Sequence, residues 1–262
     1  MENQPKHVNK NNYAEYLLCL TLDVGEGMLK NGAEISRVED TIERICRAYG
    51  AIHVEVFSII SFISAAIRLP DGSYSSQQRR VRSTSTNLNT LERLNSLSRE
   101  ICKETPELDV FDEKIHEIKK TSHYPIWVKV IASAFAVGGF AIFFGGELVD
   151  GIVAALIGIT ISVVENYSPK RINSMAKTVV SSFFASLIAG LSVMLGLGTN
   201  ADAVIIGTIM ILVPGLAFGT ALRDLLCGDL LAGSLKTLNA CLGALMIAFG
   251  YMLAASLLGG AI

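Results

Sequence analysis

Residues 126–144 have the sequence IWVKVIASAFAVGGFAIFF, in which Lys129 is the only charged residue. A helix needs roughly 20 mostly apolar residues to cross the hydrocarbon core of a bilayer, so this stretch predicts a membrane-spanning helix. Four further apolar stretches follow it. The sequence therefore predicts about five transmembrane helices, at residues 126–144, 148–164, 179–197, 203–222 and 235–258.

Charge divides the chain just before the first apolar stretch. Of the 46 Asp, Glu, Lys and Arg residues, 34 lie before Ile126. The mean hydropathy of +0.46 is high for a soluble protein of this length, and the apolar excess lies in the second half. We therefore expect a soluble domain over residues 1–122 and a transmembrane domain over residues 123–262, in an α-helical polytopic membrane protein.

The soluble domain combines helical and strand patterns. Apolar residues recur at helical spacing over residues 13–31, and Gly32 then suits the left-handed turn that ends a helix. Ser36 and Glu39 have the spacing of a capping box, which predicts a helix that is capped by Ser36 and stops at Gly50. Strands are expected at residues 52–60, 62–69 and 78–83, and further helices after Asn87 and at residues 110–120. The domain is therefore expected to be α+β, with helices packed on a small sheet.

Positive charge marks one side of the membrane. The connections before the first span and after the second and fourth spans contain lysine or arginine, whereas the first and third connections between spans contain neither. The residues on the positive side are Lys119, Lys120, Lys129, Lys170, Arg171, Lys177, Arg223 and Lys236. The positive-inside rule therefore predicts a cytoplasmic N-terminus and an outside C-terminus in the cytoplasmic membrane. Residues 1–12 are polar, so no cleavable signal peptide is expected.

Composition argues against several classes of function. A net charge of −2 disfavours a nucleic-acid partner. The five cysteines form no CxxC pair, and the sequence contains no HExxH, GxSxG or Walker pattern. None of the four histidines lies in a predicted span, which excludes a histidine proton relay through the membrane. We therefore expect no catalytic residue, no metal and no cofactor, and we expect membrane lipid as the surrounding partner.

Candidate transport residues lie in and after the fourth predicted span. Pro214 and Gly215 are in its middle, where proline must kink or break the helix. A broken helix presents backbone groups of the kind that transporters use to hold polar solutes, and a packing kink without a ligand is an equally good explanation. Downstream, Arg223, Asp224 and Asp229 interrupt an apolar run. They suggest a charged gate on the cytoplasmic side, the alternative being an ordinary loop between helices.

Four other polar residues of the membrane half are candidates. Glu147 and Asp150 lie at the outer end of the second predicted span, and Glu165 lies at its inner end. Carboxylates there either carry protons in a proton-coupled transporter or are solvated ends of helices. Asn239, in the fifth predicted span, is expected to hydrogen-bond across helices or to contact a solute.

Several motifs resemble the threonine/serine exporter family. Residues 32–41, GAEISRVEDT, followed by Ala48-Tyr49-Gly50, are similar to the opening signature of that family. Its continuation resembles Asn87-Leu88, Val213-Pro214-Gly215, Arg223-Asp224 and Gly228-Asp229. The likeness extends over nearly the whole chain.

The resemblance implies an exporter of a small amino acid or organic acid in the cytoplasmic membrane, driven by the proton gradient. The chain is similar to the larger subunit of the split form of the family, and this likeness implies a smaller membrane subunit as its partner. The split form includes a two-component system linked to succinate export. Threonine, serine and succinate all carry a carboxylate, so the solute stays open. The signature falls on Glu34, Ser36, Arg37 and Glu39, and the implied transport positions are Pro214, Gly215, Arg223, Asp224 and Asp229.

Two other functions stay open from the sequence. A membrane-anchored hydrolase would use the soluble domain for turnover, but an anchor needs only one span and no Pro-Gly break. A regulatory subunit that supports a transporting partner without itself moving solute is the second alternative.

Overall fold

The computed structural model of the chain describes residues 12–82, 85–120, 124–167 and 173–259. By internal packing the chain divides into two compact units. The first comprises Met1–Ser122 with Leu216–Thr237, and the second comprises His123–Gly215 with Leu238–Ile262. The segment Leu216–Thr237 therefore packs with the N-terminal part, although the sequence alone assigns it to the transmembrane domain.

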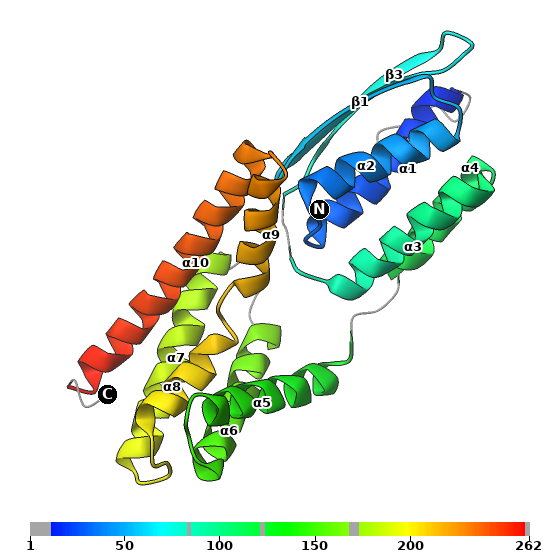
Figure 1. Cartoon of the computed structure of the whole chain (residues 1–262). Helices are drawn as coiled ribbons and strands as arrows, with labels where there is room; N and C mark the ends of the chain where they lie inside the picture. Colours follow the sequence, from blue (N-terminus) through cyan, green and yellow to red (C-terminus); the bar gives the residue numbers. More distant parts are fainter. Residues whose placement is uncertain (1–11, 83–84, 121–123, 168–172, 260–262) are drawn as a thin grey trace. The chain divides into compact units, whose positions relative to one another are not determined.

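The first unit has three layers, a sheet and two pairs of helices (Figure 1). The middle layer is α1 (Tyr13–Lys30) and α2 (Ile35–Ala48), and the outer layer is α3 (Leu88–Glu104) and α4 (Leu108–Lys120). The sheet consists of β1 (His53–Ile59), β2 (Phe62–Arg68) and β3 (Tyr74–Arg80), antiparallel in the order β1-β2-β3. Among the residues of this part that the structure describes, the strands form one small sheet.

Side-chain alternation along β2 explains how the sheet joins the core. Ile63, Ala65 and Ile67 are buried, because successive residues of a strand point to opposite faces. The third strand begins at Tyr74, four residues earlier than predicted. A tight turn causes this shift, since Leu69 N already donates to the Ser73 carbonyl at 2.9 Å and pairing resumes directly after it.

The second unit is a bundle of apolar helices. It contains α5 (Ile126–Phe143), α6 (Leu148–Tyr167), α7 (Ser174–Met194), α8 (Ala201–Met210) and the C-terminal part of α10 (Leu230–Leu257). Helices α6 and α8 are both central, because each contacts the other as well as α5 and α7. Two predicted positive residues, Lys170 and Arg171, and the side chain of Glu165 lie outside the part of the chain that the structure describes.

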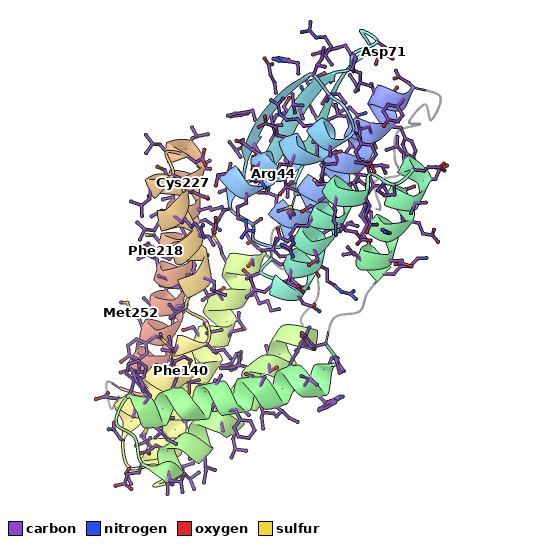
Figure 2. All side chains as sticks on the ribbon, turned by 45° about the vertical axis from the view of Figure 1, so that its right-hand side comes forward. Arg44, Asp71, Phe140, Phe218, Cys227 and Met252 are labelled. Atoms are coloured by element: carbon purple, nitrogen blue, oxygen red, sulfur yellow. The ribbon has the colours of Figure 1, made fainter. Side chains whose placement is uncertain are left out.

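Three helices among the described residues, α5, α7 and α10, are long and apolar enough to cross a membrane. The bent pair of α8 and α9 (Gly215–Leu226) is a fourth candidate span. The apolar part of α6, Leu148–Val164, is too short to be counted with them. The prediction of about five spans is thus supported for three or four helices. Large apolar side chains such as Phe218 on α9 and Met252 on α10 are exposed, as expected where lipid is the solvent (Figure 2).

The contact between α5 and α8 depends on a glycine. A Cβ atom at Gly207 would lie 2.5 Å from Ala141 N and 2.7 Å from Ala141 Cα, so only a residue without a side chain fits. Gly207→Ala is expected to lower the free energy of unfolding by roughly 1–3 kcal/mol, because the backbones of two helices must separate. Gly139→Ala is the matched control, since a Cβ there meets no atom within 4 Å. Thermal melting of both purified variants checks this, and equal melting temperatures would contradict the close packing.

Candidate functional site

The fourth predicted span is broken at Pro214, as the Pro-Gly dipeptide predicts. Helix α8 ends at Met210, α9 begins at Gly215, and the two helices are bent by 56°. Pro214 has no N–H to donate to the carbonyl of Met210. Val213 N donates to that carbonyl instead, at 3.3 Å. Gly215 N donates to the Val213 carbonyl at 2.8 Å. The α-helical ladder is therefore replaced by tighter turns over this short segment.

Beyond the break, α9 and α10 form a close helical hairpin within the first unit. Gly228 turns the chain with φ of +96°, and Asp229 N donates to the Asp224 carbonyl at 2.9 Å. A Cβ at Gly233 would lie 2.8 Å from Leu225 N, so the two helices approach at the distance of their backbones. This approach brings the side chain of Lys236 on α10 against Asp224 on α9.

Asp224 and Lys236 form a buried ion pair at the start of α2. Asp224 is 0% exposed, the side chain of Lys236 is 14% exposed, and Lys236 Nζ lies 2.6 Å from Asp224 Oδ2. Ile35 N donates to Asp224 Oδ1 at 3.3 Å, and Lys236 Nζ donates to the Ala33 carbonyl at 3.2 Å. A carboxylate at a helix N-terminus also interacts favourably with the helix dipole. The hairpin is thus fixed to α2 by charge as well as by hydrogen bonds.

The predicted capping box of α2 is wrong. The helix begins at Ile35, and its N-cap residue is Glu34, whose side chain makes no capping hydrogen bond. Asp224, from a distant part of the chain, instead accepts from Ile35 N. Ser36 lies half-buried inside the helix and Arg37 is exposed. The backbone of Ala33 and Ile35 and the side chain of Glu34 therefore contact α9 and α10, whereas Ser36 does not cap the helix.

The expected gate requires Arg223 to pair with Asp224 or Asp229. In the structure Arg223 pairs with Glu34 instead. Its Nη1 donates to Glu34 Oε1 at 2.9 Å, and its side chain is well exposed. An exposed pair of this kind contributes at most about 1 kcal/mol. Arg223–Glu34 is accordingly a peripheral contact beside the buried pair.

Glu39 lies on the next turn of α2 and holds the sheet. Its Oε1 accepts from Ser58 N at 2.6 Å and from Ser58 Oγ at 3.0 Å. Burial raises the pKa of the Glu39 carboxyl, the two bonds from Ser58 oppose that rise, and the charge of Asp229 adds to it. Glu39 thus joins α2 to β1 through Ser58.

Asp150 joins two turns of the second unit. It is 0% exposed, and its Oδ2 accepts from Glu147 N and Thr199 Oγ1, both at 2.8 Å. Its Oδ1 accepts from Thr199 N at 2.7 Å and Asn200 N at 3.2 Å. The carboxylate with four donors thus ties the turn before α6 to the turn before α8, which is a structural task.

The remaining candidates stay apart from this arrangement. Glu147 is exposed, and its backbone rather than its carboxylate contacts Asp150. Asn239 is exposed on α10. Pro214 lies in the second unit. A Cβ atom built at Gly243 of α10 would lie 3.7 Å from the Cγ atom of its ring.

The sequence model of the family described as "Putative threonine/serine exporter" matches residues 19–258. The chain belongs to this family. The match extends from within α1 to just past the end of α10, and with the apolar helices it identifies a multi-pass membrane protein.

A protein of Mycobacterium tuberculosis described as "Probable threonine/serine exporter" is 24% identical over 222 residues. The aligned part is 82% of this chain and 41% of that protein, so the chain spans about two fifths of its relative's length. No solved structure matches the chain.

In this member of the threonine/serine exporter family, sequence reasoning missed two residues, Lys236 beside Asp224 in the first unit and Thr199 beside Asp150 in the second. Lys236 was used only to orient the helices, yet it is the one lysine after Lys177, and such a charge in an apolar helix needs a partner. Thr199, which gives Asp150 two of its four bonds, lies in a loop without any pattern.

Proposed function

We propose that this chain is a subunit of a secondary exporter that moves a small amino acid or organic acid out across the cytoplasmic membrane. Threonine and serine are the first solutes to test, and a dicarboxylate such as succinate is the next. The observation that carries the proposal is the broken span at Pro214, because an interrupted helix in a membrane presents backbone groups to a polar solute. Membership of the exporter family supports the same function.

Proton coupling is the second part of the proposal, and the pair of Asp224 and Lys236 supports it. The two charges balance each other in a buried position, and buried ionisable groups of membrane proteins often mark proton or ion pathways. If either charge were lost, the hairpin of α9 and α10 would lose its firmest attachment to α2. A change in the charge balance of this pair would thus favour one position of the hairpin over another.

The exporter is proposed to need a second, smaller membrane chain. The mycobacterial relative extends far beyond the part that matches this chain. A separate chain of the same family would correspond to part of that extension and complete the pathway. We further propose that residues 1–122 are cytoplasmic, that the C-terminus is outside, and that α6 and the broken helix complete five crossings.

Efflux from cells loaded with labelled threonine, serine or succinate tests the function. The cells express both chains, this chain alone, or neither chain. Faster efflux of one solute with both chains supports the exporter and names its solute. Equal efflux with and without this chain contradicts it and favours the regulatory subunit, and turnover by a soluble fragment would favour the anchored hydrolase.

Pro214→Ala tests the broken helix. We expect efflux to fall at least about tenfold, because alanine restores the donor at position 214 and lets the two helices straighten. Insertion into the membrane and the amount of protein are expected to stay unchanged. Pro125→Ala, at the N-cap of α5, is the matched control and is expected to keep efflux. Normal efflux by Pro214→Ala would place the solute elsewhere.

A further inference from the structure

Helix α7 buries a series of serine hydroxyl groups in the second unit. Two of them are paired, since Ser182 Oγ donates to the Ile247 carbonyl and Ser192 Oγ to the Ala189 carbonyl, both at 2.7 Å. Two others are not. Within the described part of the chain, Ser181 Oγ and Ser186 Oγ are the buried side-chain atoms that lack a hydrogen-bond partner.

A buried hydroxyl group without a partner is unfavourable for folding, because it loses its bonds to water and gains none. Close helix packing does not explain it. The same helix uses Ala185 and Ala189 at equally buried positions, so alanine fits there without the penalty. Ser181 is 2% exposed and Ser186 is 0% exposed, so neither hydroxyl reaches bulk water in this conformation.

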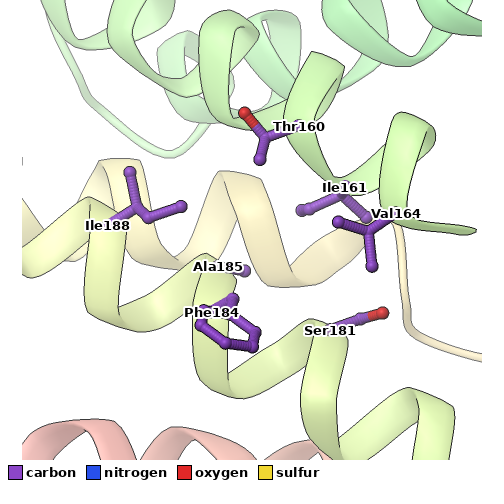
Figure 3. A pocket seen from close by; sticks show the side chains of 7 residues that line it. All are labelled: Thr160, Ile161, Val164, Ser181, Phe184, Ala185 and Ile188. Carbon is purple, nitrogen blue, oxygen red and sulfur yellow. The ribbon is translucent and has the colours of Figure 1, made fainter.

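Ser181 also lines a cavity between α6 and α7 (Figure 3). Thr160, Ile161 and Val164 of α6 form one wall, and Phe184 lies beside Ser181 on the other. The Thr160 hydroxyl is already bonded to the Leu156 carbonyl at 3.2 Å. The cavity has a volume of about 10 Å³, roughly the room for one water molecule, so a larger solute requires α6 and α7 to move apart.

We infer that Ser181 and Ser186 are contacts for the exported solute on α7, and that each hydroxyl donates to its carboxylate when the neighbouring helices separate. This inference rests on the proposed export function. Residues five positions apart project about 140° from each other on a helix, so the two hydroxyls face different neighbours, and Ser181 is the one that lines the cavity. The cavity at Ser181 lies between α6 and α7, so these two helices are the ones that separate to admit the solute at Ser181.

Stability and transport are expected to change in opposite directions. Ser181→Ala and Ser186→Ala should each raise the melting temperature of the purified full chain by roughly 2–4 °C, because an unpaired polar group is removed. Each should also raise the internal solute concentration that gives half-maximal efflux, by roughly 2- to 10-fold, the equivalent of one hydrogen bond. Ser182→Ala and Ser192→Ala, which remove paired hydroxyls of the same helix, should lower the melting temperature and leave half-saturation unchanged.

Efflux is measured in cells that contain both chains. If the wild type exports solute and the Ser181 and Ser186 variants export it with the same half-saturation, the hydroxyls serve only a void or a water molecule and the inference is overturned. A lower melting temperature of these variants overturns it as well.

If the wild type exports none of the three solutes, the proposed function fails by itself. The change in melting temperature that each solute causes in the purified chain then shows whether Ser181 contacts a solute. A shift in the wild type that Ser181→Ala loses supports the contact, and no shift in the wild type overturns it.

Discussion

Replacing Asp224 with asparagine is expected to reduce efflux at least about tenfold and to lower the free energy of unfolding by about 3 kcal/mol. The reason is that Lys236 Nζ, 2.6 Å from Asp224 Oδ2 and mostly buried, would keep its charge without a counter-charge. Ile35 N would also lose a charged acceptor at the start of α2. Thermal melting and efflux of the same preparation measure the two effects together.

A double variant measures the interaction between Asp224 and Lys236 separately from the effect of losing one of the two charges. Asp224→Asn combined with Lys236→Met removes both charges, so it should be more stable than Asp224→Asn alone by at least about 1 kcal/mol. Arg223→Gln is the matched control, because that neighbouring charge is well exposed and its loss should change stability by less than about 1 kcal/mol. If Asp224→Asn kept wild-type stability and wild-type efflux, the buried pair would have neither role.

Asp150→Asn is expected to lower the free energy of unfolding by about 3–5 kcal/mol. Four donors converge on the two oxygens of this carboxylate, and an amide would turn one acceptor into a donor that faces them. The turns before α6 and α8 would then separate. Circular dichroism of the purified chain during heating measures the loss.

Asp202→Asn is the control for this second change. Asp202 lies in the first turn of α8, close in sequence to the same turn, and its side chain is exposed. Its replacement should change stability by no more than about 0.5 kcal/mol. A stable Asp150→Asn protein that has lost only proton-driven efflux would instead make Asp150 a proton carrier and contradict its structural task.

Local patterns predicted much of the fold. Apolar spacing gave the helix that the structure has at Tyr13–Lys30, and Gly32 ends it with φ of +93°. The Pro214-Gly215 break was predictable because proline lacks the donor that a helix requires at that position. The third strand was misplaced, since Ser75, Ser76 and Gln77 carry no apolar alternation that would mark them as a strand.

The site depended on contacts between distant residues, which no local pattern contains. Ser36 and Glu39 matched a capping box, yet Asp224 caps α2 from 189 positions further along the chain, and Glu39 bonds Ser58. The predicted pairing of Arg223 with Asp224 had a physical objection in the sequence itself. Adjacent residues of a helix point in different directions, so they do not face each other.

Helix α10 is longer than a membrane crossing requires. Its 28 residues extend for about 42 Å, whereas a hydrocarbon core is roughly 30 Å thick. The surplus of about 12 Å corresponds to Leu230–Thr237, the turns that belong to the first unit. The helix contains no proline that would let it hinge. It therefore runs unbroken through both units, and its Leu238–Leu257 part, about 30 Å long, is by itself long enough to cross a hydrocarbon core.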